Sequence, residues 1–355
     1  MRIAFVNQDR GISPEGEKGA AVHLAALRNA LTHTGAEVLA FDQPHDDKLV
    51  SDLDRAWRAG HFDLIYERYA LGKDTACRFA KQVGVPFALE VNSPLLEEAA
   101  TYREHEVTDR EVACEDFLMR EAERVFAVSY AIGEYARSRG ARRIEVCPNG
   151  VDTTVFYPRP HSDLRSSLVS PGQLVVGFHG RLRPWHGIEF LGFAIKAALA
   201  DGLPVHVITV GRGDYEELLS PYIPPQNRSH FQWVPHDEVA RYVACFDVLP
   251  LCYQQPVYFS PLKLAEGMAS GAVPVVPYGG DWERFLVHGE NALYYPTGSA
   301  ESMSACLERL VSGTGERERM GVSALNTAQT LSWNSIAQRV LSVASFANSG
   351  QEVPS

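Results

Sequence analysis

The chain has 355 residues and a formal net charge of −11 at pH 7. This length is typical of two domains, and 45% hydrophobic with 22% charged residues is the balance of a globular protein, not of a disordered one. The acidic balance, without any run of basic residues, disfavours nucleic acid as a partner, because phosphate backbones are bound by clustered cations.

Six cysteines are scattered along the chain without a CxxC pair. This spacing argues against a zinc cluster or a disulfide framework and favours a reducing compartment. The apolar start at residues 2–7 reads as a strand and is too short for a signal peptide, and no apolar run approaches the ~20 residues that a membrane span needs. The sequence therefore predicts a soluble, cytoplasmic protein with no integral membrane segment.

Short apolar runs alternate with helical patterns in the first half of the chain. We expect strands at 2–7, 36–41, 62–68, 86–92 and 124–129, and a helix at 20–35 that ends at a glycine. Strands that alternate with helices in this way are typical of βαβ units, so the sequence predicts a parallel, doubly wound sheet.

The same alternation restarts in the second half. A stretch at 148–173 is rich in Pro, Ser, Asp and Gly and lacks periodicity, so we place the inter-domain linker there. Strands are then expected at 174–180, 204–211, 230–234, 247–252 and 273–278. We predict an α/β protein with Rossmann-like domains at 1–160 and 166–330, the first joined by the C-terminal helix 333–347. Ligands would bind in a cleft between the carboxyl ends of the two sheets.

The segment SPLKLAEGMASGAVPVV (260–276) predicts a short helix over 261–270, with Ser260 as its N-cap, followed by a buried strand. Lys263 and Glu266 are three residues apart and share a helix face that differs from the apolar face. A surface ion pair beside a core stripe and a ligand-binding face explain this pattern equally well from the segment alone.

Three loops at strand ends offer groups to a ligand. Arg181 follows the strand 174–180 with a fork-shaped cation, and His186 adds a second donor five residues on, a pair suited to a diphosphate. Gly211 lies in a glycine-rich turn between a strand and a helix. Gly19, in the loop after the first strand, would let the backbone approach a ligand closely. Each of these segments, taken alone, is also consistent with an ordinary solvated loop.

Taken together, these segments resemble the family 4 retaining glycosyltransferases of the GT-B fold. The resemblance covers nearly the whole chain and includes PNGVDTTVFYP (148–158), GFHGRLRPWHG (177–187), VGRGDYEELL (210–219) and the segment 260–276. It implies two Rossmann-like domains that face each other across a cleft. It also implies transfer of a sugar from a nucleotide donor with retention of the anomeric configuration.

The resemblance also implies roles for single residues. In the family, the carboxylate that matches Glu266 accepts hydrogen bonds from the ribose hydroxyls of the donor, and the cations that match Arg181 and Lys263 lie near the diphosphate. The helix N-terminus at Ser260 and Leu262 would add its dipole. On this basis the lysine and the glutamate share a face because they bind one ligand.

The sequence departs from the family pattern at three positions. Many members carry a glutamate eight residues before Glu266, where this chain has Tyr258, and a lysine where it has His186. Many also place a histidine near Asn92. We keep Asn92, with Arg181, Lys263 and Glu266, as catalytic candidates. Tyr258, His186 and Val234 are kept as donor-binding candidates, since the resemblance implies that the loops near Val234 and Tyr258 read the base and the sugar.

The sequence thus predicts a retaining glycosyltransferase that moves a sugar from a nucleotide sugar, with a UDP-sugar favoured, to a hydroxyl of a small-molecule or glycan acceptor. No cofactor and no metal ion are expected, because Arg181 and Lys263 supply the positive charge and the D-x-D match at 52–54 reads as a solvated helix face. The alternatives are a GT-B epimerase or hydrolase of nucleotide sugars and a non-catalytic nucleotide-sugar-binding protein. A nicotinamide dehydrogenase is disfavoured because the first βα loop lacks GxGxxG.

Overall fold

The computed structural model describes residues 1–12, 19–102, 105–159, 163–182, 186–232, 234, 236–254 and 260–349. The chain forms two compact units. Unit 1 consists of Met1–Gly150, Tyr258–Ser260 and Trp333–Ser355, and unit 2 consists of Val151–Val257 and Pro261–Ser332. The chain therefore passes between the units four times, after residues 150, 257, 260 and 332.

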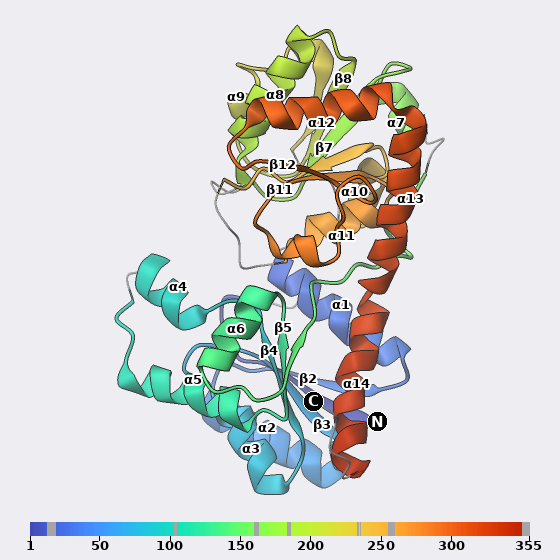
Figure 1. Ribbon diagram of the computed structural model, residues 1–355. Helices are drawn as coiled ribbons and strands as arrows, with labels where there is room; N and C mark the ends of the chain where they lie inside the picture. The colour runs from blue at the N-terminus through green and yellow to red at the C-terminus, as the bar shows by residue number, and fades with distance from the viewer. Residues whose placement is uncertain are drawn as a thin grey trace. The chain divides into compact units, whose positions relative to one another are not determined.

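Unit 1 is built on a parallel six-stranded sheet with the order β2-β1-β3-β4-β5-β6. Its strands are β1 Arg2–Asn7, β2 Glu37–Asp42, β3 Leu64–Arg68, β4 Phe87–Val91, β5 Arg124–Ala127 and β6 Ile144–Val146. Its helices are α1 Gly19–His33, α2 Asp46–Ala59, α3 Thr75–Val83, α4 Leu95–Tyr102, α5 Asp109–Glu121, α6 Tyr130–Ser138 and α14 Trp333–Ser349. The C-terminal helix α14 packs alongside α1, the first helix of the chain (Figure 1).

Unit 2 is also built on a parallel six-stranded sheet, with the order β12-β11-β10-β7-β8-β9. Its strands are β7 Leu174–His179, β8 Val205–Val210, β9 Arg228–Phe231, β10 Val248–Pro250, β11 Val273–Pro277 and β12 Leu293–Tyr295. Its helices are α7 Asp163–Leu168, α8 Ile188–Ala200, α9 Tyr215–Leu219, α10 His236–Val243, α11 Leu262–Ala269, α12 Ala300–Ser312 and α13 Thr314–Thr330, with 3₁₀ turns at Pro225–Asn227 and Asp281–Arg284.

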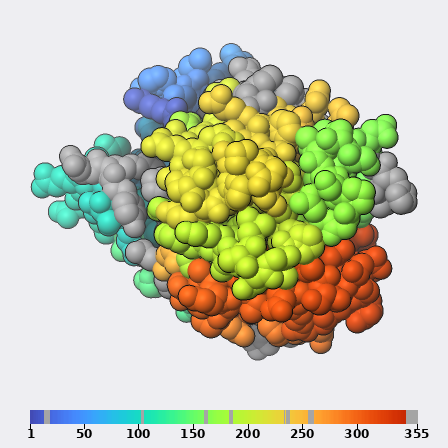
Figure 2. Space-filling view, turned by 90° about the horizontal axis from the view of Figure 1, so that it is seen from above, coloured from blue at the N-terminus to red at the C-terminus, as the bar shows by residue number. Residues whose placement is uncertain are grey.

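The central strands of each sheet are buried, whereas the edge strands β2, β6 and β9 are partly exposed. β3, β4, β7, β8 and β11 have no exposed or half-exposed residue, as expected for parallel strands covered on both faces. In unit 2 α12 packs against α8, and Figure 2 shows the orange residues of α12 beside the yellow-green residues of α8 on the outer surface of this unit. The predicted α/β architecture with two Rossmann-like sheets is confirmed.

The short edge strands were not predicted. β6 and β12 have three residues each, which is too few for a strand period to show against the flanking loops. The third strand of unit 2 begins two residues earlier than the expected 230–234 and ends at Phe231. Among the described residues, no helix is long and apolar enough to cross a membrane.

Candidate functional site

The helix α11 carries the polar pair on which the sequence prediction depends. It spans Leu262–Ala269 and buries Leu264 and Met268 as its core stripe. Its N-cap is Pro261, in an extended conformation and without a side-chain cap. The prediction that Ser260 caps this helix is therefore wrong. The serine hydroxyl instead accepts a hydrogen bond of 2.9 Å from a backbone N–H elsewhere in unit 1.

Lys263 and Glu266 each face a histidine of unit 2. Nζ of Lys263 lies 3.4 Å from Nε2 of His186 and 3.9 Å from the centroid of the Phe178 ring. Oε2 of Glu266 lies 3.4 Å from Nε2 of His179. The side chain of Glu266 is only 13% exposed, so the alternative of a solvated surface ion pair does not fit this arrangement.

The environment shifts the pKa values of both groups on α11 toward neutrality. Burial lowers the pKa of Lys263 to about 7, although the nearby Glu266 carboxylate works against this change. Burial likewise raises the pKa of Glu266 to about 7 against the effect of Lys263. Opposite shifts of this kind in one cluster are typical of binding and catalytic sites, because a ligand that contacts both groups can favour their charged forms.

The loops after β7 and β8 meet next to this cluster. Gly211 has a φ of +136°, and a Cβ at this position would lie 2.1 Å from the carbonyl oxygen of Gly180. The hydroxyl of Tyr215 donates to the same carbonyl at 2.7 Å. Glycine is therefore required at 211 for the close approach of the two loops. Arg181, directly after Gly180, is exposed at the surface of unit 2.

The remaining predicted residues fall in three groups. His186 is buried beside Lys263, and Leu262 and Val234 are half-buried in unit 2. Gly19, Asn92 and Ser260 belong to unit 1, where Gly19 is the exposed first residue of α1. Tyr258 lies outside the described residues.

His179 is a residue that sequence reasoning missed. It is the last residue of β7, is 4% exposed, and is the partner of Glu266. The signal was present in the sequence, since a histidine that ends an otherwise apolar buried strand lies at the carboxyl edge of a parallel sheet, where ligands of α/β folds bind.

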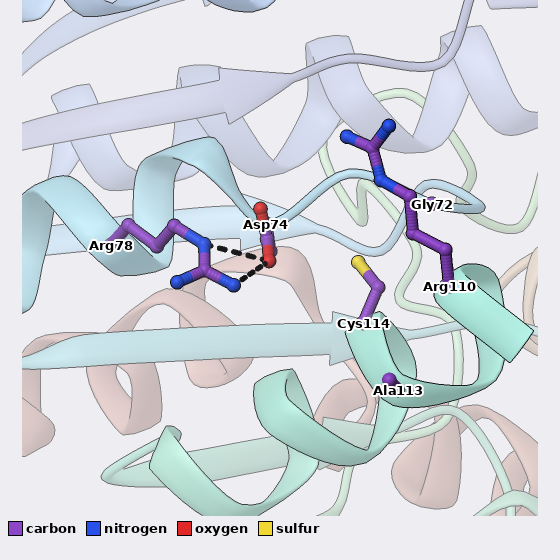
Figure 3. A pocket seen from close by; sticks show the side chains of 6 residues that line it. All are labelled: Gly72, Asp74, Arg78, Arg110, Ala113 and Cys114. Carbon is purple, nitrogen blue, oxygen red and sulfur yellow. Dashed lines mark hydrogen bonds and ion pairs between the residues drawn. The ribbon is translucent and has the colours of Figure 1, made fainter.

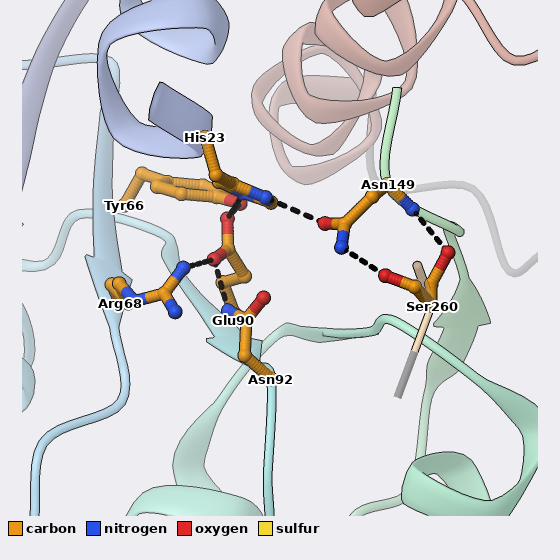
Figure 4. Close-up of polar contacts among 7 residues, drawn as sticks. All are labelled: His23, Tyr66, Arg68, Glu90, Asn92, Asn149 and Ser260. Atoms are coloured by element: carbon orange, nitrogen blue, oxygen red, sulfur yellow. Dashed lines mark hydrogen bonds and ion pairs between the residues drawn. The ribbon is translucent and has the colours of Figure 1, made fainter. Parts of the chain in front are cut away.

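Unit 1 contains a buried polar cluster around Glu90, at the carboxyl end of β4 (Figure 4). One carboxylate oxygen accepts from Tyr66 at 2.5 Å and from His23 at 2.8 Å. The other accepts from Arg68 at 2.8 Å and from the amide of Asn92. Burial alone would raise the pKa of Glu90, but His23, Arg68 and Tyr66 outweigh it and hold the pKa well below its usual range. Glu90 is therefore ionised and fixes the amide of Asn92.

A second buried carboxyl in unit 1 has a different state. Both carboxyl oxygens of Glu67, on β3, are buried without a hydrogen-bond partner among the described residues. Burial, reinforced by Asp74 and Asp46, raises its pKa well above the usual range. The pKa of Glu67 is thus shifted in the opposite direction to that of Glu90.

A cavity of about 350 Å³ lies in unit 1 between the loop after β3 and the helices α3 and α5 (Figure 3). It is lined by Gly72, Asp74, Arg78, Arg110, Ala113 and Cys114. Arg78 donates to Asp74 through Nε at 2.8 Å and pairs with it through Nη2 at 2.7 Å. Burial raises the pKa of the Cys114 thiol to about 12, so this thiol is protonated and is no nucleophile. None of the predicted site residues lines the cavity.

The acidic D-x-D match lies on a helix, as the sequence predicted. Asp52 and Asp54 belong to α2, where each pairs with an arginine three or four residues further along, Arg55 and Arg58. Within the part of the chain that the structure describes, no group of three or more His, Cys, Asp or Glu side chains is arranged to hold a metal ion.

Two parallel six-stranded α/β units are the architecture of the GT-B fold, which solved glycosyltransferases share over nearly the whole chain. Residues 173–313 match the family model described as "Glycosyl transferases group 1", and residues 4–150 match the "Glycosyl transferase 4-like domain". The chain belongs to the glycosyl transferases group 1 family and is a glycosyltransferase.

Curated relatives agree with this family. The chain is 24% identical over 313 residues to a D-inositol 3-phosphate glycosyltransferase of Nocardioides. The aligned region covers 80% of this chain and 67% of the relative. It is also 24% identical over 307 residues to the protein of the same name from Kribbella flavida, with coverage of 79% and 70%.

Solved structures share the fold at low identity. Anabaena HepE in complex with UDP matches with a TM-score of 0.75 and 20% identity, over 97% of this chain and 100% of that one. A glycosyltransferase from Rickettsia africae matches with a TM-score of 0.77 and 13% identity, over 99% of both chains. Sucrose-phosphate synthase from Thermosynechococcus elongatus matches with a TM-score of 0.71 and 18% identity, over 99% and 100%.

Proposed function

We propose that this glycosyltransferase is a retaining, metal-independent enzyme that moves a sugar from a UDP-sugar to a hydroxyl of a small-molecule or glycan acceptor. The observation that carries the proposal is the pair on α11. Lys263 and Glu266 are largely buried, face His186 and His179 at 3.4 Å, and have pKa values shifted toward neutrality. A nucleotide diphosphate offers what both need, namely an anion for the lysine and ribose hydroxyl donors for the glutamate.

The donor site is proposed in unit 2. Arg181, His186 and Lys263 would contact the diphosphate, and Glu266 would accept from the ribose hydroxyls. The first turn of α11 at Leu262, with Ser260 just before it, would add the partial positive charge of a helix N-terminus. Gly211 and Val234, with Tyr258, would border the base and the sugar. The complexes of HepE with UDP and with UDP-glucose support UDP as the nucleotide.

The chemistry follows from the charges. The anomeric C–O bond of the donor breaks through an oxocarbenium-like state, and the nucleoside diphosphate leaves with negative charge on its oxygen. Arg181 and Lys263 would stabilise that charge, an effect worth about 2.7–4 kcal/mol for a well-placed donor. The acceptor hydroxyl would attack from the face that the diphosphate leaves, and a phosphate oxygen would take its proton. No protein nucleophile is needed.

Two residues of unit 1 are proposed to contact substrate. Because the amide N–H of Asn92 donates to Glu90, its Oδ1 is left to accept from a substrate hydroxyl. Gly19, at the start of α1, would allow a close backbone approach. The relatives named D-inositol 3-phosphate glycosyltransferases favour a small hydroxyl-bearing acceptor. Six free, buried cysteines favour a reducing compartment, so we propose that the enzyme works in the cytoplasm.

The test is a thermal-shift screen of nucleotide sugars, followed by transfer assays. A ligand at 100 times its Kd adds about 2.7 kcal/mol of stability, which a melting curve detects. UDP-sugars should raise the melting temperature most, and the product should keep the anomeric configuration of the donor by NMR. Donor turnover without transfer to any acceptor would instead favour an epimerase or hydrolase, and inversion would contradict the mechanism.

A further inference from the structure

His23 is buried in unit 1 with an oxygen facing each of its ring nitrogens. The residue is 6% exposed and lies on α1. Its Nε2 is 2.8 Å from a carboxylate oxygen of Glu90, and its Nδ1 is 2.7 Å from Oδ1 of Asn149 (Figure 4). A neutral imidazole can donate from one nitrogen only, so the nature of the two acceptors decides its state.

The orientation of the Asn149 amide is set by its second partner. Its Nδ2 lies 2.5 Å from the carbonyl oxygen of Ser260, which can only accept, so the NH₂ group must be on that side. Oδ1 then faces His23 and can only accept from it. On the other side of the ring, Tyr66 donates to the carboxylate oxygen of Glu90 that faces His23, and Arg68 and Asn92 donate to its other oxygen, so this carboxylate is also an acceptor. Both ring nitrogens of His23 therefore face hydrogen-bond acceptors.

His23 also lies where the chain passes between the units. Asn149 is the last residue but one of the first stretch of unit 1, Ser260 ends its second stretch, and Trp333 starts its third. The indole of Trp333 packs edge to face on the His23 ring, with centroids 4.8 Å apart. Gly150 leaves room for this packing, since a Cβ there would lie 2.7 Å from the indole.

Asn149 donates two hydrogen bonds to Ser260. Its backbone N–H donates to the serine hydroxyl at 2.9 Å, and its side chain donates to the serine carbonyl at 2.5 Å. Ser260 directly precedes Pro261, the N-cap of α11, which carries Lys263. The backbone just before the proposed donor-binding helix is thus held by a series of hydrogen bonds, from His23 to Asn149 and from Asn149 to Ser260.

We propose that His23 is a doubly protonated imidazolium, fixed by Glu90, and that it acts through Asn149 as a positioning residue for the start of α11. The second half of this inference rests on the proposed donor site, whereas the first half does not. The charge matters because only an imidazolium can donate to Glu90 and to Asn149 at once. Arg68 and Tyr66 also donate to Glu90, so the carboxylate stays ionised beside the histidine.

The protonation state can be read directly by NMR. In the full chain labelled with ¹⁵N-histidine, the His23 signals are those lost in a His23→Gln variant, or those shifted in Asn149→Asp. At neutral pH we expect both ring nitrogens of His23 to show an attached proton. A signal of an unprotonated ring nitrogen would overturn the proposal, whether or not the enzyme binds a nucleotide sugar.

Two substitutions separate the contacts. In His23→Gln a single side chain can donate from one end only, so it cannot serve both Glu90 and Asn149. In Asn149→Asp an acceptor for His23 remains, but the N–H that holds the Ser260 carbonyl is lost. The matched control is His206→Gln. His206 is a comparably buried histidine, 4% exposed, that bonds to Ser229 on the sheet of unit 2.

Hydrogen exchange measured on peptides that cover residues 260–268 should rise in His23→Gln and Asn149→Asp but not in His206→Gln. The Kd for UDP-glucose should rise roughly 5- to 100-fold in the same two variants, the cost of leaving one buried polar group unpaired. The double variant should lose little more affinity for UDP-glucose than either single variant, because both substitutions break the same series of hydrogen bonds.

Unchanged exchange and unchanged Kd in folded variants would overturn the positioning role. If His23→Gln does not fold, Asn149→Asp still decides. If the wild-type enzyme binds no nucleotide sugar, the proposed function fails, and exchange and NMR still test the role of His23.

Discussion

Nζ of Lys263 lies 3.4 Å from Nε2 of His186, although the two residues are 77 positions apart in the chain. An ammonium group has no lone pair, so the histidine nitrogen that faces it must be the acceptor. Lys263 also lies over the face of Phe178, where the ring quadrupole favours a cation. His186 and Phe178 are thus two partners for a charged lysine, and the Glu266 carboxylate works against the burial that lowers the pKa of Lys263 to about 7.

His186 is the first target for substitution. If the His186 side chain orients Lys263 and contacts the diphosphate, its loss in His186→Ala should weaken binding of UDP-glucose by about 1.5–3 kcal/mol. This is the value of a hydrogen bond to a charged group. Isothermal calorimetry measures this change. His186→Lys, which places the more usual residue of the family at this position, should bind the donor better than the alanine variant. Wild-type affinity in His186→Ala would leave the histidine with a packing role only.

The pH dependence of donor binding follows from the two shifted pKa values. Lys263 must be charged to bind a diphosphate, and it loses its proton in the empty enzyme as the pH rises through about 7, so affinity should fall on the alkaline side. Glu266 must be ionised to accept two ribose hydroxyls, and it gains a proton as the pH falls through about 7, so affinity should fall on the acid side.

Affinity for UDP-glucose should thus be highest near neutral pH. Calorimetry over a pH series tests this, with UDP-glucose preferred to UDP because its diphosphate does not itself titrate near neutrality. Lys263→Met should remove the alkaline decline and Glu266→Gln the acid one, each at lower overall affinity. A flat profile for the wild-type enzyme would mean that neither group titrates on binding.

Metal independence is a separate expectation. It rests on the cations at Arg181 and Lys263, which would supply the charge that a divalent ion provides in other transferases. Transfer activity should persist in EDTA at the same rate as in buffer. A complete loss on chelation that Mn²⁺ or Mg²⁺ restores would contradict a mechanism that relies on protein cations.

Much of the fold could be predicted from the sequence because parallel strands buried on both faces are runs of apolar residues. Strands such as β7 and β8 begin and end within a residue or two of the predicted bounds. β6 and β12 could not be predicted, since three residues at a sheet edge carry no period. Their pairing is set by neighbouring strands, which is tertiary information.

Of the predicted site residues, the structure brings Lys263 and Glu266, which helix spacing placed on one face, next to buried histidines, and His186 is one of them. The site was not predictable where a polar residue is held by distant partners. Serine before proline is a strong capping signal, yet the hydroxyl of Ser260 is bound to Asn149, 111 positions away. Likewise the pattern of α1 gives no hint that His23, on its buried face, pairs with Glu90.

The role of Glu266 offers the sharpest test of the donor site. Glu266→Gln keeps the size and the helix propensity of the side chain but removes the charge that makes hydrogen bonds from ribose hydroxyls strong. Affinity for UDP-glucose should fall roughly 10- to 150-fold, the range expected when about 1.5–3 kcal/mol of a charged hydrogen bond is lost. The melting temperature should not fall, because burial already disfavours the charged form of this carboxyl.

A donor with 2′-deoxyribose removes one partner from the other side of the same contact. With the wild-type enzyme it should show a comparable loss of affinity, and with Glu266→Gln it should lose little more, because two cuts through one interaction are not additive. Glu283→Gln is a matched control, since Glu283 bonds to the backbone N–H of Gly279 in a different loop of unit 2. Calorimetric titration of the three enzymes with both donors completes the cycle. If the two losses simply add, or if neither appears, Glu266 does not contact the ribose, and the burial that raises its pKa then belongs to the packing of α11 and not to a nucleotide site.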